Sequence, residues 1–270
     1  MQKLLLYTAS TPNGQKVQNF AEELKATYPG KFDFEYKSVS LSKNEQKEDW
    51  FIKINPNGRI PALVDPNNNN FCVFETAAIL LYLEKKYDPE HKFSWPSSDP
   101  QADDYRSEVL QWMFFIHGGV GPMQGQANHF NRYAPEDVPY AKKRYTTETI
   151  RLYEVLESRL EGRDWLVGSG KGQYSLADIN AYPWVQWYRW AGLKDEQVGP
   201  NVKAWVKRNL DREAVHKGMY APSGKNEILD MVLDPDFFTK HAEGVEKHAK
   251  EASAWVMKGM KDDSEKADKK

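Results

Sequence analysis

The sequence predicts an α/β unit followed by an all-helical region, because its apolar pattern changes along the chain. Up to about residue 87, short apolar runs typical of strands alternate with helical patterns. After residue 100 the strand signals stop, and apolar residues recur at helical spacing. Residues 88–100 hold three prolines and are predicted to form the linker between the two parts.

The first part, residues 1–87, is predicted to have the element order β-α-β-α-β-β-α. Its elements are a strand at 3–7, a helix after the turn at 11–14, a strand around 32–36, a helical stretch at 44–53, strands at 62–65 and 71–74, and a helix at 76–87. This order indicates a compact thioredoxin-like domain.

The second part, residues 101–220, is predicted to be an all-helical domain. Ser175-Leu176-Ala177-Asp178 resembles a capping box that starts one of its helices. The polar extension at 221–270 is expected to hold a helix around 237–258 and to be disordered over its last ten residues.

Composition excludes several classes of partner. A net charge of -2 gives no reason to expect nucleic acid or an anionic membrane. The apolar runs are too short to span a bilayer, and the N-terminus lacks the pattern of a signal peptide. The single cysteine, Cys72, excludes an intramolecular disulfide and fits a cytoplasmic protein. No Cys/His zinc pattern occurs, so no metal is expected.

Two segments predict a site for a peptide-like ligand. Residues 55–61, Asn-Pro-Asn-Gly-Arg-Ile-Pro, lead into a strand, and a cis bond at Ile60–Pro61 would turn the backbone of Ile60 outward. Glu75-Thr76 stands where an apolar helix begins, and free N–H groups there can hold a carboxylate with help from the Thr76 hydroxyl.

The turn after the first strand reads Ser10-Thr11-Pro12-Asn13-Gly14 and contains no cysteine. Thiol chemistry at this turn therefore needs a thiol that the ligand supplies. Asn13 and Thr11 are the best candidates to stabilise its thiolate by hydrogen bonding, with Ser10 next. The alternative is that these residues only cap the helix.

With these residues in place, the chain resembles the glutathione transferases, over about residues 3–215. The resemblance is closest to the fungal and bacterial branch that holds the nu-class enzymes and a yeast regulator of nitrogen catabolism. The segments that carry it are residues 11–14, 55–63, 74–80, 112–126 and 129–130. It implies a glutathione transferase fold, glutathione as co-substrate and a homodimer.

The resemblance also implies roles for single residues. Asn13 and Thr11 would lie near the glutathione sulfur. Ile60, before a cis Pro61, would pair with the cysteinyl backbone. The remaining contacts to the tripeptide would come from Glu75 and Thr76 at the γ-glutamyl end, and from Gln46, Arg59 and the helical-domain residue Arg144. The alternative for Arg144 is a solvated charge beside Lys142 and Lys143.

Three functions remain open from the sequence. The thiolate can conjugate glutathione to a small electrophile, or it can reduce a disulfide or peroxide, as the branch resemblance favours. The third is a non-catalytic regulatory protein on the same fold. In the turn, Ser10 departs from the proline of close bacterial relatives, so activation by serine stays open.

Overall fold

The structure is a computed structural model that describes residues 1–267, and it begins with a four-stranded sheet. The strand order is β2-β1-β3-β4, with β1 parallel to β2 and β3 antiparallel to both β1 and β4. The strands are β1 (Leu4–Thr8), β2 (Phe34–Ser38), β3 (Ala62–Asp65) and β4 (Phe71–Phe74). The predicted thioredoxin-like domain is confirmed.

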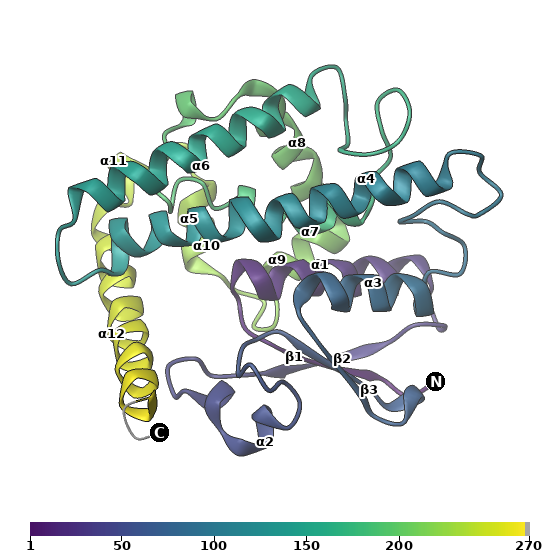
Figure 1. Ribbon diagram of the computed structural model, residues 1–270, viewed down its shortest axis with the longest axis horizontal. Helices are drawn as coiled ribbons and strands as arrows, with labels where there is room; N and C mark the ends of the chain where they lie inside the picture. Colours follow the sequence, from purple (N-terminus) through teal and green to yellow (C-terminus); the bar gives the residue numbers. More distant parts are fainter. Residues whose placement is uncertain (268–270) are drawn as a thin grey trace.

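Helices cover both faces of this sheet. α1 (Pro12–Thr27) and α3 (Thr76–Tyr87) lie between the sheet and the helical layer (Figure 1), and Phe20 and Leu80 are fully buried there. The opposite face carries α2 (Asp49–Ile52), whose Phe51 packs with Val39. The single helical stretch expected at 44–53 is divided at Glu48, whose backbone is extended, into a 3₁₀ turn at Glu45–Lys47 and α2.

Gly14 allows the start of α1 to lie against β1. A Cβ atom at this position would collide with the backbone oxygen of Ala9 and the hydroxyl of Thr8. The first turn of α1 is thus held tightly against the end of β1, where the candidate site lies.

The helical part follows a stretch without helix or strand at 88–101. Its helices are α4 (Ala102–Phe115), α5 (Gly121–Asn128), α6 (Pro139–Leu160), α7 (Leu176–Val185), α8 (Pro200–Leu210), α9 (Glu213–Tyr220), α10 (Glu227–Leu233), α11 (Phe237–Lys240) and α12 (Ala242–Ala267). Two π-helical segments, Ile116–Val120 and His129–Tyr133, flank α5. One buried apolar cluster joins α1 and α3 to these helices, so the two parts share a core.

The predicted capping box at the start of α7 is present. Ser175 Oγ accepts from the backbone N–H of Ala177, and Asp178 Oδ2 accepts from the backbone N–H of Ser175. Asp178 Oδ1 also accepts from Leu166 N at 3.0 Å and Trp205 Nε1 at 2.8 Å. Burial nevertheless raises the pKa of this carboxyl to about 6, because it lies wholly inside the protein.

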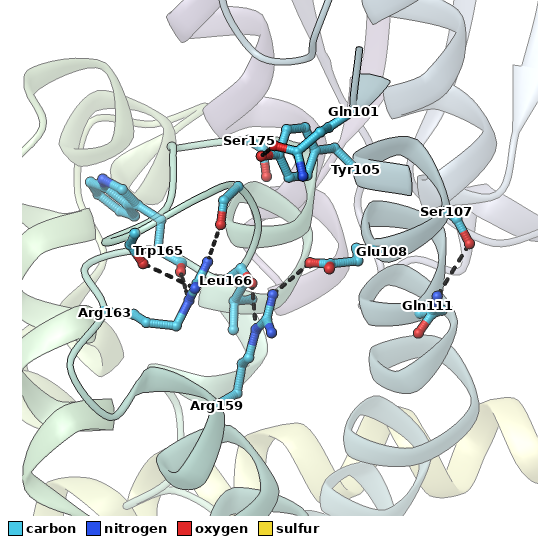
Figure 2. Close-up of polar contacts among 12 residues, drawn as sticks. Gln101, Tyr105, Ser107, Glu108, Gln111, Arg159, Arg163, Trp165, Leu166 and Ser175 are labelled. Atoms are coloured by element: carbon cyan, nitrogen blue, oxygen red, sulfur yellow. Dashed lines mark hydrogen bonds and ion pairs between the residues drawn. The ribbon is translucent and has the colours of Figure 1, made fainter. Parts of the chain in front are cut away.

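An arginine ties the loop after α6 to α4. Arg159 donates to Glu108 Oε2 at 2.6 Å and to the backbone oxygen of Leu166 at 2.7 Å, and both contacts are drawn in Figure 2. Arg163 donates to the backbone oxygen of Trp165 in the same loop. These contacts hold the segment that leads into α7.

The C-terminal extension is more helical than expected. Beyond α9 the chain forms α10, α11 and α12, and α12 runs down the side of the molecule to the level of α2 (Figure 1). The expected disorder of the last ten residues is wrong as far as Ala267, because elongation of a helix that its first turns already anchor needs no new nucleation. Residues 268–270 lie outside the described part. Between residues 1 and 267 we find no helix with the length and apolar content that crossing a membrane requires.

Candidate functional site

A cleft of about 450 Å³ lies between the thioredoxin-like domain and the helical domain. It collects residues from seven separate parts of the chain, from the turn before α1 to α12. The residues that line it are Thr11, Pro12, Asn13, Leu41, Gln46, Asn55, Asn57, Arg59, Ile60, Pro61, Glu75, Thr76, His117, Trp184 and Trp255. Eight of the ten site residues predicted from the sequence are among them.

The turn before α1 supplies Thr11 and Asn13. Thr11 is the N-cap residue, and its Oγ1 accepts from Gly14 N at 3.1 Å, as the capping alternative expected. Asn13 makes a different contact: its Oδ1 accepts from the indole Nε1 of Trp184 on α7, at 2.9 Å. An indole N–H can only donate, so it fixes which end of the amide carries the oxygen. The Nδ2 group of Asn13 is left to donate elsewhere.

The loop before β3 is ordered by Asn55. This buried side chain donates to the backbone oxygen of Arg59 at 2.6 Å and accepts from Asn57 N at 3.0 Å. The loop ends at the Ile60–Pro61 peptide bond, which is cis, as the sequence allowed. Both residues of that bond face the cleft.

Gln46 adds a buried acceptor to this side of the cleft. Its Nε2 donates to Asn44 Oδ1 at 2.7 Å, whereas its buried Oε1 has no hydrogen-bond partner among the described residues. A buried acceptor without a partner is costly, and a ligand N–H can satisfy it.

The start of α3 supplies Glu75 and Thr76. α3 begins at Thr76, as predicted, and Glu75 has a φ of 70°, which is uncommon for a residue other than glycine. Such strained positions concentrate at functional sites. The Thr76 hydroxyl is buried and lies 3.3 Å from His117 Nε2.

Behind Thr76 lies a polar group that the sequence did not predict. His117 Nε2 is 3.0 Å from Asn180 Oδ1 and 3.4 Å from Lys16 Nζ. Asn180 Nδ2 faces the backbone oxygen of Met113, so Asn180 presents its oxygen to His117 and Nε2 carries the proton.

Burial shapes the charges of this group. Lys16 is 1% exposed, and burial lowers its pKa to about 7, with the charge of Glu75 opposing the shift. Burial and the nearby Lys16 lower the pKa of His117 to about 4, so its imidazole is neutral at pH 7. The cleft residue His117 is therefore neutral, and the buried Lys16 next to it is only partly protonated at pH 7.

Two predicted site residues lie outside the cleft. Ser10 Oγ donates to the backbone oxygen of Ala221 at 2.7 Å, so it ties the turn to the chain after α9. Arg144 lies on α6 with a side chain that is 54% exposed, 4.0 Å from Glu148. Its position fits the solvated-charge alternative.

Within residues 1–267, no group of three or more His, Cys, Asp or Glu side chains is placed to hold a metal ion.

Sequence reasoning missed four cleft residues, Leu41, His117, Trp184 and Trp255. His117 lies in a π-helical segment, a feature frequent at functional sites, within the unusual run at 112–126. Trp184 follows Pro183 inside α7, and no periodicity marks it. Trp255 lies in the polar extension, where nothing in the sequence pointed to the cleft.

Comparisons with known protein families agree with the fold. The glutathione S-transferase N-terminal domain family matches residues 7–85, and the corresponding C-terminal domain family matches residues 112–213. The chain belongs to the glutathione S-transferase family, as the sequence resemblance indicated.

Among curated relatives, the disulfide-bond oxidoreductase YfcG of Escherichia coli is 40% identical, over 79% of this chain and 93% of its own length. Glutathione S-transferase 2 of Schizosaccharomyces pombe is 37% identical, over 80% and 94%. These relatives support a glutathione transferase-type function for the chain.

Solved structures with bound glutathione are also similar. A glutathione transferase homolog of Lodderomyces elongisporus with two glutathione molecules per subunit has a TM-score of 0.72 and 38% identity, covering 82% of this chain and all of that one. Yeast Ure2p in complex with glutathione has a TM-score of 0.71 and 31% identity, covering 80% and 98%.

Proposed function

We propose that the cleft binds glutathione and that the side-chain amide of Asn13 stabilises its thiolate. The observation that carries this proposal is the hydrogen bond from Trp184 Nε1 to Asn13 Oδ1, which leaves Nδ2 as a donor at the cleft. A donor aimed at sulfur favours the charged thiolate and lowers the thiol pKa. The Oγ1 atom of Thr11 accepts the capping hydrogen bond at the start of α1. The hydroxyl of Thr11 can still donate a weaker hydrogen bond to the sulfur.

The rest of the tripeptide matches the rest of the cleft. The Thr76 hydroxyl and the backbone at the start of α3 hold the γ-glutamyl carboxylate, and Glu75 faces the γ-glutamyl ammonium group. Ile60 pairs with the cysteinyl backbone. The buried Oε1 of Gln46 accepts from a ligand N–H, and Arg59 stands near the glycyl carboxylate.

The bound thiolate serves two reactions. With an electrophilic carbon it forms a C–S bond and expels the leaving group with its electron pair, while the thiol proton has gone to solvent. With a disulfide it forms a mixed disulfide and releases one thiolate. A second glutathione then attacks, giving oxidised glutathione and the second reduced thiol. The naming of YfcG as a disulfide-bond oxidoreductase supports the second reaction.

Replacement of Asn13 tests the proposal. Asn13→Ala should lower kcat/KM by at least about tenfold, since a hydrogen bond to a charged group contributes roughly 1.5–3 kcal/mol. Asn13→Asp keeps the acceptor for Trp184 but places a negative charge near sulfur, so it should raise the thiol pKa further, as read from the thiolate absorbance. Unchanged kinetics in both variants would remove Asn13 from the mechanism.

Glutathione binding without any turnover in the unmodified protein would support the regulatory alternative.

A homodimer and a cytoplasmic location complete the proposal. Large exposed apolar side chains, Phe71 and Phe74 on the edge strand β4 and Phe114 on α4, give a second copy an apolar surface to cover. Sedimentation of the purified protein tests the dimer, and a monomeric mass at micromolar concentration would contradict it. The free thiol of Cys72 suits a reducing compartment.

A further inference from the structure

The C-terminal extension contributes a side chain to the candidate site. Trp255, on α12, lines the same cleft as Asn13 and Trp184. The matched family domains end at residue 213, well before α12. The Lodderomyces elongisporus homolog is covered over its whole length by 82% of this chain, so this chain carries residues that the homolog lacks.

The structure fixes α12 close to this position. Val245 and Ala249 are buried in the shared core. Ser253 Oγ donates to the backbone oxygen of Tyr133 at 2.7 Å, two residues before Trp255. The helix is thus anchored on the π-helical segment His129–Tyr133 before it reaches the cleft, and Figure 1 shows it continuing past the helical layer toward the level of α2.

Trp255 lies outside the buried core of the protein. Its side chain belongs to neither buried apolar cluster, and the residue is 36% exposed. Trp205 on α8, by contrast, is fully buried. A partly exposed indole that lines a cleft offers apolar surface to a ligand.

We propose that Trp255 determines acceptor specificity by providing an apolar wall. This wall favours flat, apolar electrophiles over a hydrophilic acceptor of the size of a second glutathione. This inference rests on the proposed binding of glutathione in the cleft. The polar side chains Gln46, Asn55 and Arg59 come from the thioredoxin-like domain, whereas the two indoles come from the helical side. A planar apolar group on the glutathione sulfur gains contact with an indole, but a second charged tripeptide loses water there without equivalent partners.

The test compares the affinities of two ligands by calorimetry, so that it does not depend on turnover. The ligands are glutathione and its S-dinitrophenyl conjugate, measured with unmodified protein, Trp255→Ala, Trp255→Phe and the control Met260→Ala. Met260 lies on the same helix, is 54% exposed and is not a lining residue of the cleft. We expect Trp255→Ala to lower the preference for the conjugate by roughly three- to tenfold, with glutathione affinity unchanged. Trp255→Phe and Met260→Ala should preserve the preference.

Kinetics add a second readout. Trp255→Ala should lower kcat/KM for an aryl chloride while kcat/KM for a mixed disulfide of glutathione stays equal or rises. An unchanged affinity ratio, or an equal loss for both acceptors, would overturn the inference while leaving the proposed function intact. If the unmodified protein bound no glutathione at all, the proposed function would fail, and this inference with it.

Discussion

The two walls of the cleft are built by different means. The wall from the thioredoxin-like domain is ordered by contacts between near neighbours in sequence, such as Thr11 with Gly14 and Asn55 with Arg59. The helical wall depends on distant partners: Trp184 meets Asn13 across 171 residues. The first wall is polar and suits the tripeptide, whereas the second adds two indoles and a neutral imidazole. The first wall is therefore suited to binding glutathione and holds Asn13, whereas the second orients the Asn13 amide through Trp184.

The largest effect should come from the polar wall. Thr76→Val removes the hydroxyl that we assign to the γ-glutamyl carboxylate, and the KM for glutathione should rise about tenfold or more. We expect kcat to change little, because this contact is made equally in the ground and transition states. Thr76→Ser keeps the hydroxyl and serves as the control. A fall in kcat at constant KM would contradict the division of roles between the walls.

Lys16 lies behind both walls, next to His117, and it should make the stability of the fold depend on pH. Its pKa is about 7 in the folded protein and near 10.5 when unfolded. Between these values the unfolded chain binds more protons, so this lysine makes stability rise with pH from 7 to 10.5. The slope for one such proton is at most about 1.4 kcal/mol per pH unit. Lys16→Met should remove this rise.

Urea unfolding of both proteins at several values between pH 7 and pH 10 measures the difference in slope. Groups other than Lys16 titrate in both proteins and cancel in the comparison. Parallel stability curves would show that Lys16 keeps an ordinary pKa in the fold.

The smallest effect should come from the helical wall. Trp184→Phe keeps an aromatic ring but removes the N–H that orients the Asn13 amide. One hydrogen bond contributes about 0.5–1.5 kcal/mol, so kcat should fall roughly two- to tenfold, with the KM for glutathione unchanged. When Trp184→Phe is combined with Asn13→Ala, kcat should fall little further than in Asn13→Ala alone. Full additivity of the two losses would show that Trp184 does not act through Asn13.

The sequence predicted the local parts of the molecule well. The strands at 62–65 and 71–74 and the helix at 76–87 match the structure at both ends, and the capping box at Ser175–Asp178 is present. These elements rest on turn residues, caps and short periodic runs, all of which act within a few residues. The same applies to the loop at 55–61, whose order comes from Asn55 within the segment.

Other features depended on packing that no local pattern records. No local pattern marked the division of 44–53 at Glu48 or the continuation of α12 to Ala267. Ser10 has the right chemistry to donate to a thiolate, but its hydroxyl donates to the backbone oxygen of Ala221, 211 residues away. Arg144 falls on the exposed side of α6.

The sequence by itself determined the domain order, the family and most of the polar wall, because short-range hydrogen bonds and caps are encoded by neighbouring residues. Only the tertiary structure brought Lys16, His117, Trp184 and Trp255 to one place. Their positions depend on how helices from distant parts of the chain cross. Side-chain spacing within one helix gives its buried face but not the partner that this face meets.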